Sequence, residues 1–222
     1  MPAKNSRKTY VENGYYHIYN RGVEKRIIFL DQQDYSVFLS YLKDYLLPKN
    51  EKELYERLSD PQISSKEKDK VLKLLHLNNF GQEITLLAYC LMPNHFHFFV
   101  KQKNIEAIDN FMNSLATRYT MYFNRKYKRV GHLYQGVYKA VLINNEAQFL
   151  HLSRYIHKQA LDLKNQPCSY PEYMGSRQTL WIKPDEVLNY FSRTNPSSSY
   201  QNFVEQPEEN EKLKDLTLEE DS

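Results

Sequence analysis

The sequence predicts an α+β fold in which an antiparallel sheet carries helices. Two β-rich runs, residues 83–92 and 95–102, are separated only by Pro93-Asn94, which indicates a hairpin. An aromatic, alternating run at residues 14–20 indicates another strand. Long stretches with apolar residues at helical spacing lie between and after these strands, so helices are expected to share a core with the sheet.

The elements of the first half follow in order along the chain. The first strand is expected to end at a turn near Gly22. A helix is predicted for residues 31–47, because apolar residues recur there three and four positions apart and Asp31 is placed as its N-cap. Residues 48–80 are rich in Lys and Glu and contain several breakers, which favours two short solvated helices inserted before the hairpin.

A second set of elements follows the hairpin. Residues 105–127 have helical spacing, and the end of this stretch is strongly basic. Residues 132–143 are predicted to be a strand or an extended segment. Asn144 or Asn145 is expected to cap a last long helix that runs to about Leu163.

One domain is expected at residues 10–191, because a chain of 222 residues with 41% hydrophobic residues can bury one substantial core. The helical insertion at 48–80 and a C-terminal extension at 164–191 are expected additions. The extension is expected to contain one short helix near residues 185–191. From residue 192 to 222 the chain is expected to be a disordered acidic tail.

Charge is distributed unevenly along the chain. A formal net charge of +3 combines −6 in residues 201–222 with +9 in residues 1–200. A basic body suits a polyanionic partner such as nucleic acid, although many soluble domains carry this much charge. Two cysteines without CxxC spacing do not form a disulfide framework and give no sign of a zinc site. No signal core and no run long enough to span a bilayer are present, so a cytoplasmic protein without a membrane partner is expected.

A motif at the end of the predicted hairpin places two histidines two residues apart on a strand. Side chains alternate along a strand, so His95 and His97 share one face, while Phe96 and Phe98 face a core. Two imidazoles on one face form half of a metal site. Taken alone, such a pair is more often a surface or packing feature than a ligand pair, so a third ligand is needed.

The last long predicted helix offers that ligand. Tyr155 and Gln159 lie one turn apart and share a face. Gln159 could complete a site with His95 and His97 for a hard ion such as Mg²⁺ or Mn²⁺, leaving positions for phosphate oxygens and water. Tyr155 would then face that phosphate. Because the chain has 19 tyrosines, Tyr155 stands out only together with this motif.

Four ordered blocks resemble the single-tyrosine HUH transposases of insertion sequences, particularly the REP-associated tyrosine transposases of bacteria. The blocks are residues 16–22 (YHIYNRG), 92–97 (MPNHFH), 131–139 (GHLYQGVYK) and 155–159 (YIHKQ). The resemblance implies a ferredoxin-like antiparallel sheet with helices packed on one face. It also implies that the histidine pair lies on a central strand and the tyrosine on an adjacent helix.

The resemblance also implies roles for the site residues. In that family the histidine pair and a polar residue one turn after the tyrosine hold a divalent metal, and the tyrosine is the nucleophile. These roles fall on His95, His97 and Gln159 as metal ligands and on Tyr155 as the catalytic residue. Many REP-associated members have Asn-Pro where this chain has Gln159-Ala160, whereas glutamine occurs at the ligand position in simpler insertion-sequence enzymes.

The implied activity is a metal-dependent nickase and strand transferase that forms a 5′-phosphotyrosine intermediate on single-stranded DNA, at hairpins or palindromic repeats. Such an enzyme needs basic grooves and aromatic platforms for exposed bases. Each basic cluster of the chain is also compatible with an ordinary solvated helix end. The candidate DNA-binding residues are Arg21, Lys25, Arg26, Arg118, Arg125, Lys126, Lys128, Arg129 and Lys139.

Two other functions are compatible with the same residues. One is a regulator derived from a transposase that binds DNA or RNA hairpins without chemistry, and the other is a metal-dependent phosphodiesterase that uses water. A pure binder would not need the two histidines, the tyrosine and the glutamine together, which favours the enzyme. Simple insertion-sequence enzymes of this family are dimers with shared sites, whereas REP-associated members can act as monomers, so both states stay open.

Overall fold

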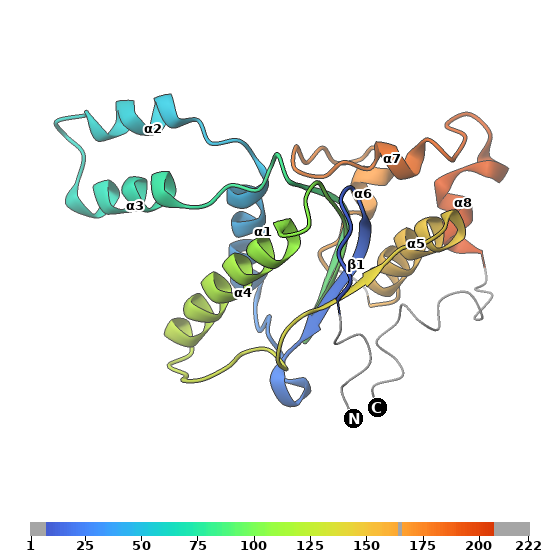
Figure 1. The fold of residues 1–222 in the computed structure, drawn as a ribbon, viewed down its shortest axis with the longest axis horizontal. Helices are drawn as coiled ribbons and strands as arrows, with labels where there is room; N and C mark the ends of the chain where they lie inside the picture. The colour runs from blue at the N-terminus through green and yellow to red at the C-terminus, as the bar shows by residue number, and fades with distance from the viewer. Residues whose placement is uncertain (1–7, 164–165, 207–222) are drawn as a thin grey trace.

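A four-stranded sheet lies at the centre of the computed structural model, which describes residues 8–163 and 166–206 (Figure 1). All neighbouring strands are antiparallel, and their order is β2-β3-β1-β4. The strands are β1 (Tyr15–Arg21), β2 (Ile84–Met92), β3 (His95–Gln102) and β4 (Lys139–Leu142).

Two long helices complete a ferredoxin-like topology. α1 (Gln32–Leu46) lies in the connection from β1 to β2, and α4 (Ala107–Lys126) lies in the connection from β3 to β4. This strand order and chain order are those of a β-α-β-β-α-β fold. The α+β, ferredoxin-like sheet expected from the sequence is therefore confirmed.

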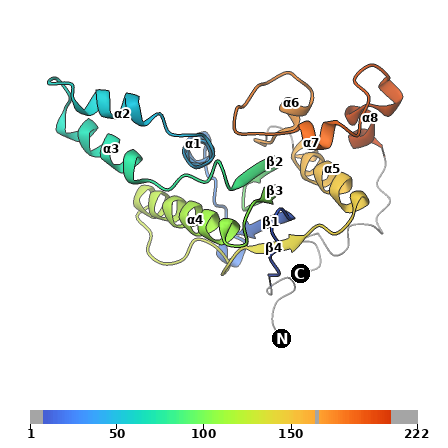
Figure 2. The same ribbon diagram turned by 45° about the horizontal axis from the view of Figure 1, so that its top comes forward.

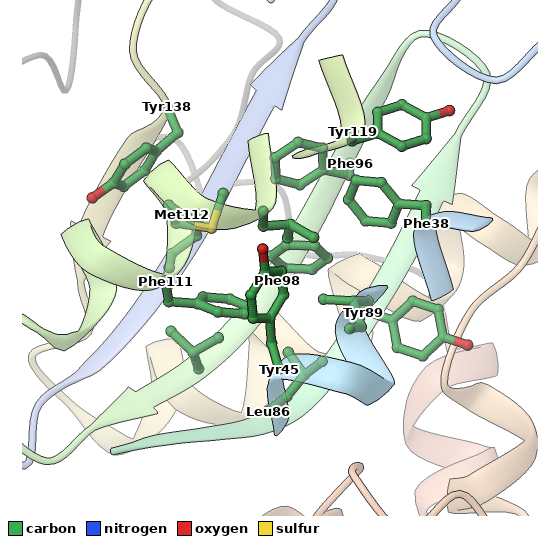
Figure 3. Packing of buried hydrophobic residues seen from close by; sticks show 14 of the residues in the cluster. Phe38, Tyr45, Leu86, Tyr89, Phe96, Phe98, Phe111, Met112, Tyr119 and Tyr138 are labelled. Atoms are coloured by element: carbon green, nitrogen blue, oxygen red, sulfur yellow. The ribbon is translucent and has the colours of Figure 1, made fainter. Parts of the chain in front are cut away.

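The helices α1 and α4 pack on one face of the sheet. α1 begins at the predicted N-cap, where the Asp31 carboxylate accepts a hydrogen bond from the Asp34 amide at 3.0 Å. The core between helices and sheet is largely aromatic (Figure 3). Phe96 and Phe98 of β3 point into it, because alternate residues of a strand share a face, as the sequence predicted.

A second helical layer covers the opposite face. α5 (Glu146–Asp162) packs on β2 and β3, together with α6 (Tyr170–Tyr173) and α7 (Asp185–Leu188) (Figure 2). This corrects the expectation that the helices pack on one face only. The physical reason is that side chains of the second face, such as Leu87 and Phe99, are also apolar and require cover.

The end of the described chain belongs to this second layer. Residues 192–206 were expected to be part of a disordered tail, but they contain η2 (Pro196–Ser198) and α8 (Tyr200–Glu205). Tyr200 and Val204 are buried against α5, so α8 has enough apolar surface to dock. The remainder of the predicted acidic tail, residues 207–222, lies outside the described residues.

The insertion is a pair of short helices, as predicted. α2 (Glu51–Leu58) and α3 (Ser65–His76) pack on each other and extend away from the sheet (Figure 1). Ser64 and Glu67 form a reciprocal capping box at the start of α3. Within the described residues, no helix is long and apolar enough to cross a bilayer.

A buried histidine anchors α5. His157 Nδ1 lies 2.7 Å from the hydroxyl of Tyr200 on α8, and His157 Nε2 lies 2.8 Å from Ser169 Oγ. Ser169 Oγ in turn accepts the backbone N–H of Tyr89 on β2 at 2.9 Å. Burial lowers the pKa of His157 to about 3, so the ring is neutral and shares hydrogen bonds with two hydroxyl groups.

We expect acid to destabilise the protein in part through His157. Its pKa is about 3 when folded and about 6.5 when unfolded, so between these values the unfolded chain binds a proton that the folded chain excludes. Stability from this group is complete above pH 6.5 and is lost as the pH falls, by at most about 1.4 kcal/mol per pH unit.

Urea unfolding of wild type and His157→Gln at about pH 7.5 and about pH 5 measures this effect. The free energy of unfolding should fall less in the variant, by about 2 kcal/mol. An equal fall in both proteins would show that His157 does not contribute to the acid sensitivity.

Candidate active site

The sheet presents polar side chains to the face that α5 covers. Tyr19 of β1 is the Cα partner of His97 of β3, and Arg21 is the partner of His95. Because side chains alternate along a strand, His17, His95 and His97 project to the same side, away from α1 and α4. His17 and His97 are 0% exposed.

The last long helix brings Tyr155 and Gln159 to these histidines. The ring centroid of Tyr155 lies 5.4 Å from that of His97 and 5.9 Å from that of His17, edge-on in both cases. One turn later, Gln159 Oε1 lies 3.5 Å from His95 Nε2. The structure therefore brings together all four residues that the sequence singled out for chemistry.

A third histidine belongs to the same cluster and was missed by the sequence analysis. His17 Nε2 lies 2.8 Å from His97 Nδ1, and the ring planes are inclined by 21° with their centroids 5.0 Å apart. His17 stands in the first of the four motif blocks, but its contact with His97 depends on how β1 and β3 pair. A lone histidine on an aromatic strand gives no signal of that register.

The environment keeps the histidine pair neutral. Burial lowers the pKa of His95, with a smaller effect from the cationic Arg21, although the hydrogen bond to Gln159 acts in the opposite direction. Burial, together with His17 and His95, places the pKa of His97 well below its usual value. Neutral imidazole is the form that binds a metal ion.

The donor set fits a small divalent cation. Two imidazoles and an amide oxygen converge, and the 3.5 Å between His95 Nε2 and Gln159 Oε1 is close to the separation of about 3 Å expected for adjacent ligands of one Mg²⁺ ion. His97 Nε2 is buried without a hydrogen-bond partner in the described part of the chain. No group of three or more His, Cys, Asp or Glu side chains within residues 8–163 and 166–206 is arranged as a metal centre.

Several of the candidate DNA-binding residues lie near this cluster. The Gly22 amide donates to Asn94 O at 2.8 Å, so the loop that carries Lys25 and Arg26 lies against the hairpin turn just before His95. Burial lowers the pKa of Arg129, and the positive charge of Arg26 lowers it further. A like-charged pair of this kind favours a polyanionic partner.

Two other candidate DNA-binding residues form ion pairs within the protein. Arg118 pairs with Asp44 at 2.8 Å, and Lys126 pairs with Asp31 and with the buried Asp34, each at 2.7 Å. These two cations therefore hold α4 to α1 and its N-cap. The remaining candidates are exposed or half-buried; they are Arg125 and Lys128 near the end of α4, and Lys139 at the start of β4.

Comparison with known proteins bears on residues 57–159, which match the family model described as "Transposase IS200 like". A search of curated proteins gave no match. A solved REP-associated tyrosine transposase bound to a REP hairpin is similar at 10% identity and a TM-score of 0.47, over 80% of this chain and 95% of that one. A protein of Deinococcus radiodurans R1 assigned as a transposase is similar at 16% identity and a TM-score of 0.36, over 69% and 96%.

The family match covers the part of the chain that contains the candidate site. His95, His97, Tyr155 and Gln159 all lie within residues 57–159, whereas β1 with His17 precedes them. The resemblance found in the sequence motifs is thus confirmed at the level of the family. Residues 57–159, slightly less than half of the chain, are similar to the transposase domain of the IS200-like family.

Proposed function

We propose that this protein is a metal-dependent nickase and strand transferase of single-stranded DNA with Tyr155 as its nucleophile. The observation that carries the proposal is the packing of Tyr155 against His97 beside the contact between Gln159 and His95. A phenol, two neutral imidazoles and an amide oxygen meet in one cluster built from one chain. The IS200-like family match supports chemistry on DNA.

The reaction that these groups support is a phosphoryl transfer to tyrosine. The Tyr155 oxygen forms a bond to the phosphorus as the bond to the 3′ oxygen breaks; the phenol loses its proton and the 3′ oxygen gains one. A phenol is a weak nucleophile, with an ordinary pKa of about 10. His95, His97 and Gln159 would hold Mg²⁺ or Mn²⁺, and the bound ion would supply positive charge that draws electrons from the phosphate and makes the phosphorus easier to attack.

The products are a 5′-phosphotyrosine and a free 3′-OH. Because the new bond keeps the energy of the phosphodiester, the 3′-OH of another strand can attack it and join DNA without ATP. A hydrolase that uses water would lose that energy. Strand transfer is therefore the activity that a tyrosine nucleophile serves best.

Access to the nucleophile requires a local opening. Tyr155 is 6% exposed, and its hydroxyl oxygen is buried. A phosphate reaches this oxygen only after the Tyr155 side chain or the groups over it have moved. Opening of this kind on substrate binding is common in enzymes that exclude water from their reaction.

We propose that the DNA runs along the end of the sheet where Arg21, Arg26 and Arg129 lie. Exposed bases must come close to Tyr155, which favours single strands, as in hairpins or palindromic repeats. One chain supplies all four candidate site residues, which supports a site formed within a monomer. Such a substrate places the protein at the nucleoid of a bacterial cytoplasm.

The main prediction of this proposal is a covalent protein–DNA adduct that depends on Tyr155. Labelled single-stranded hairpins from the flanks of the gene are incubated with the protein and Mn²⁺, and the products are separated on a denaturing gel. Wild type should form an adduct that EDTA abolishes. Tyr155→Phe should form none, because it lacks the attacking oxygen, while Tyr55→Phe, a change at an exposed tyrosine of α2, should behave as wild type.

Each competing function gives a different result on the same gel. Tight hairpin binding without an adduct under any metal would identify a binding regulator. Cleavage that persists in Tyr155→Phe would identify a phosphodiesterase that uses water. Either result would overturn the proposed nucleophile.

A second prediction of this proposal concerns salt dependence and separates DNA contacts from structural ion pairs. Removing both Arg26 and Arg129 by alanine substitution should flatten the slope of log affinity for single-stranded DNA against log salt by about 1.4, because each lost phosphate contact contributes about 0.7. Lys126→Ala is the matched control, since Lys126 is held by Asp31 and Asp34.

Fluorescence anisotropy between about 50 mM and about 200 mM salt measures these slopes. The control should keep the wild-type slope but unfold more easily, because Asp34 is buried and loses a counter-charge. Equal slopes for the double variant and the wild type would place the DNA elsewhere on the surface.

A further inference from the structure

We propose that His17 is a positioning residue that holds His97 in the tautomer able to bind a metal ion. The inference rests on the proposed function, because it concerns the metal site described there. His17 and His97 come from the neighbouring strands β1 and β3 and are both fully buried. Their ring nitrogens lie 2.8 Å apart.

The proton in this contact has two possible positions. A neutral imidazole has one N–H donor and one acceptor nitrogen. When His97 donates from Nδ1 to His17 Nε2, His97 Nε2 carries a lone pair and can bind a metal ion. When His17 donates instead, His97 carries its proton on Nε2, and that nitrogen cannot bind a metal ion.

A cation bound at His97 Nε2 selects the first arrangement. This atom is buried and has no hydrogen-bond partner among residues 8–163 and 166–206. Burial alone does not choose between the arrangements, because His17 Nδ1, which carries the proton in the first one, is buried as His97 Nε2 is. A lone pair on the same atom becomes satisfied as soon as a cation binds. His17 therefore acts as the acceptor that fixes Nδ1–H on His97.

The geometry of the two rings also limits their orientation. Their planes are inclined by only 21° and their centroids are 5.0 Å apart, so the rings meet edge to edge and the hydrogen bond restricts rotation of the His97 ring. A residue that served packing alone would not need a buried polar ring, because burial of an unsatisfied polar group is costly. An outer residue that fixes both tautomer and orientation is the usual support of a histidine that binds a metal ion.

Two substitutions separate the hydrogen bond from the packing. His17→Gln keeps an oxygen within reach of His97 Nδ1, and His17→Phe keeps a ring but removes the acceptor. The probe is Mn²⁺ alone, measured by isothermal titration calorimetry on the full chain without DNA. We expect His17→Phe to weaken Mn²⁺ binding by about 10- to 100-fold, and His17→Gln to stay within about threefold of wild type.

The results distinguish this inference from the proposed function. Wild type that binds no Mn²⁺ would contradict the proposed metal site itself. If wild type and His17→Phe bind Mn²⁺ with the same affinity, only the role of His17 is overturned. If Mn²⁺ binding is weakened equally in His17→Gln and His17→Phe, His17 is a packing residue and the inference is overturned. Urea unfolding of each variant in the presence of EDTA shows whether it has kept its structure.

A spectroscopic measurement tests the tautomer directly. Long-range ¹H–¹⁵N correlation spectra of the wild type with Mg²⁺ bound should show His97 with its proton on Nδ1. His17→Gln should keep this tautomer, whereas His17→Phe should shift His97 toward the Nε2–H form. A wild-type His97 with its proton on Nε2 would overturn the inference regardless of any binding result.

Discussion

The register between β1 and β3 is the constraint on which the rest of the structure depends. With Tyr19 opposite His97, Ile18 and Phe98 face α1 and α4, whereas His17 and His97 face α5. A slip of one residue would turn every side chain to the other face, burying imidazoles in an aromatic core and exposing phenylalanines to the site. The core on one face therefore fixes the geometry of the polar cluster on the other.

Because helices cover both faces, polar groups on the α5 side must find partners inside the protein. Two histidines meet this requirement in different ways. His157 places its nitrogens against the hydroxyls of Tyr200 and Ser169, which ties α5 to the sheet edge and to α8. His97 places one nitrogen against His17 and leaves the other toward Tyr155 and His95. Both ring nitrogens of His157 therefore have hydrogen-bond partners, whereas Nε2 of His97 is left as a candidate metal ligand.

Local sequence patterns predicted most of the fold and four of the candidate site residues, His95, His97, Tyr155 and Gln159. The cap of α1, the hairpin and the helix with Tyr155 are encoded within a few residues each, so periodicity and caps reveal them. His17 and the ion pairs of Arg118 and Lys126 depend on partners 74 to 95 residues away in the chain. The helix α8 and the place of α5 on the second face were not predicted, because the buried residues of α8, Tyr200 and Val204, reveal a docked helix only once α5 is present to receive them.

The position of Tyr155 depends on more of the chain than the family-matched segment. That segment ends at residue 159, yet the side chains that secure α5 through His157 come from Ser169 and Tyr200. His157 is two residues from Tyr155, on the side of the helix that faces the C-terminal layer. A small tilt of α5 would move Tyr155 and Gln159 together relative to the histidines. The four candidate site residues thus lie within the family-matched segment, while Ser169 and Tyr200, which follow it, hold α5 in place.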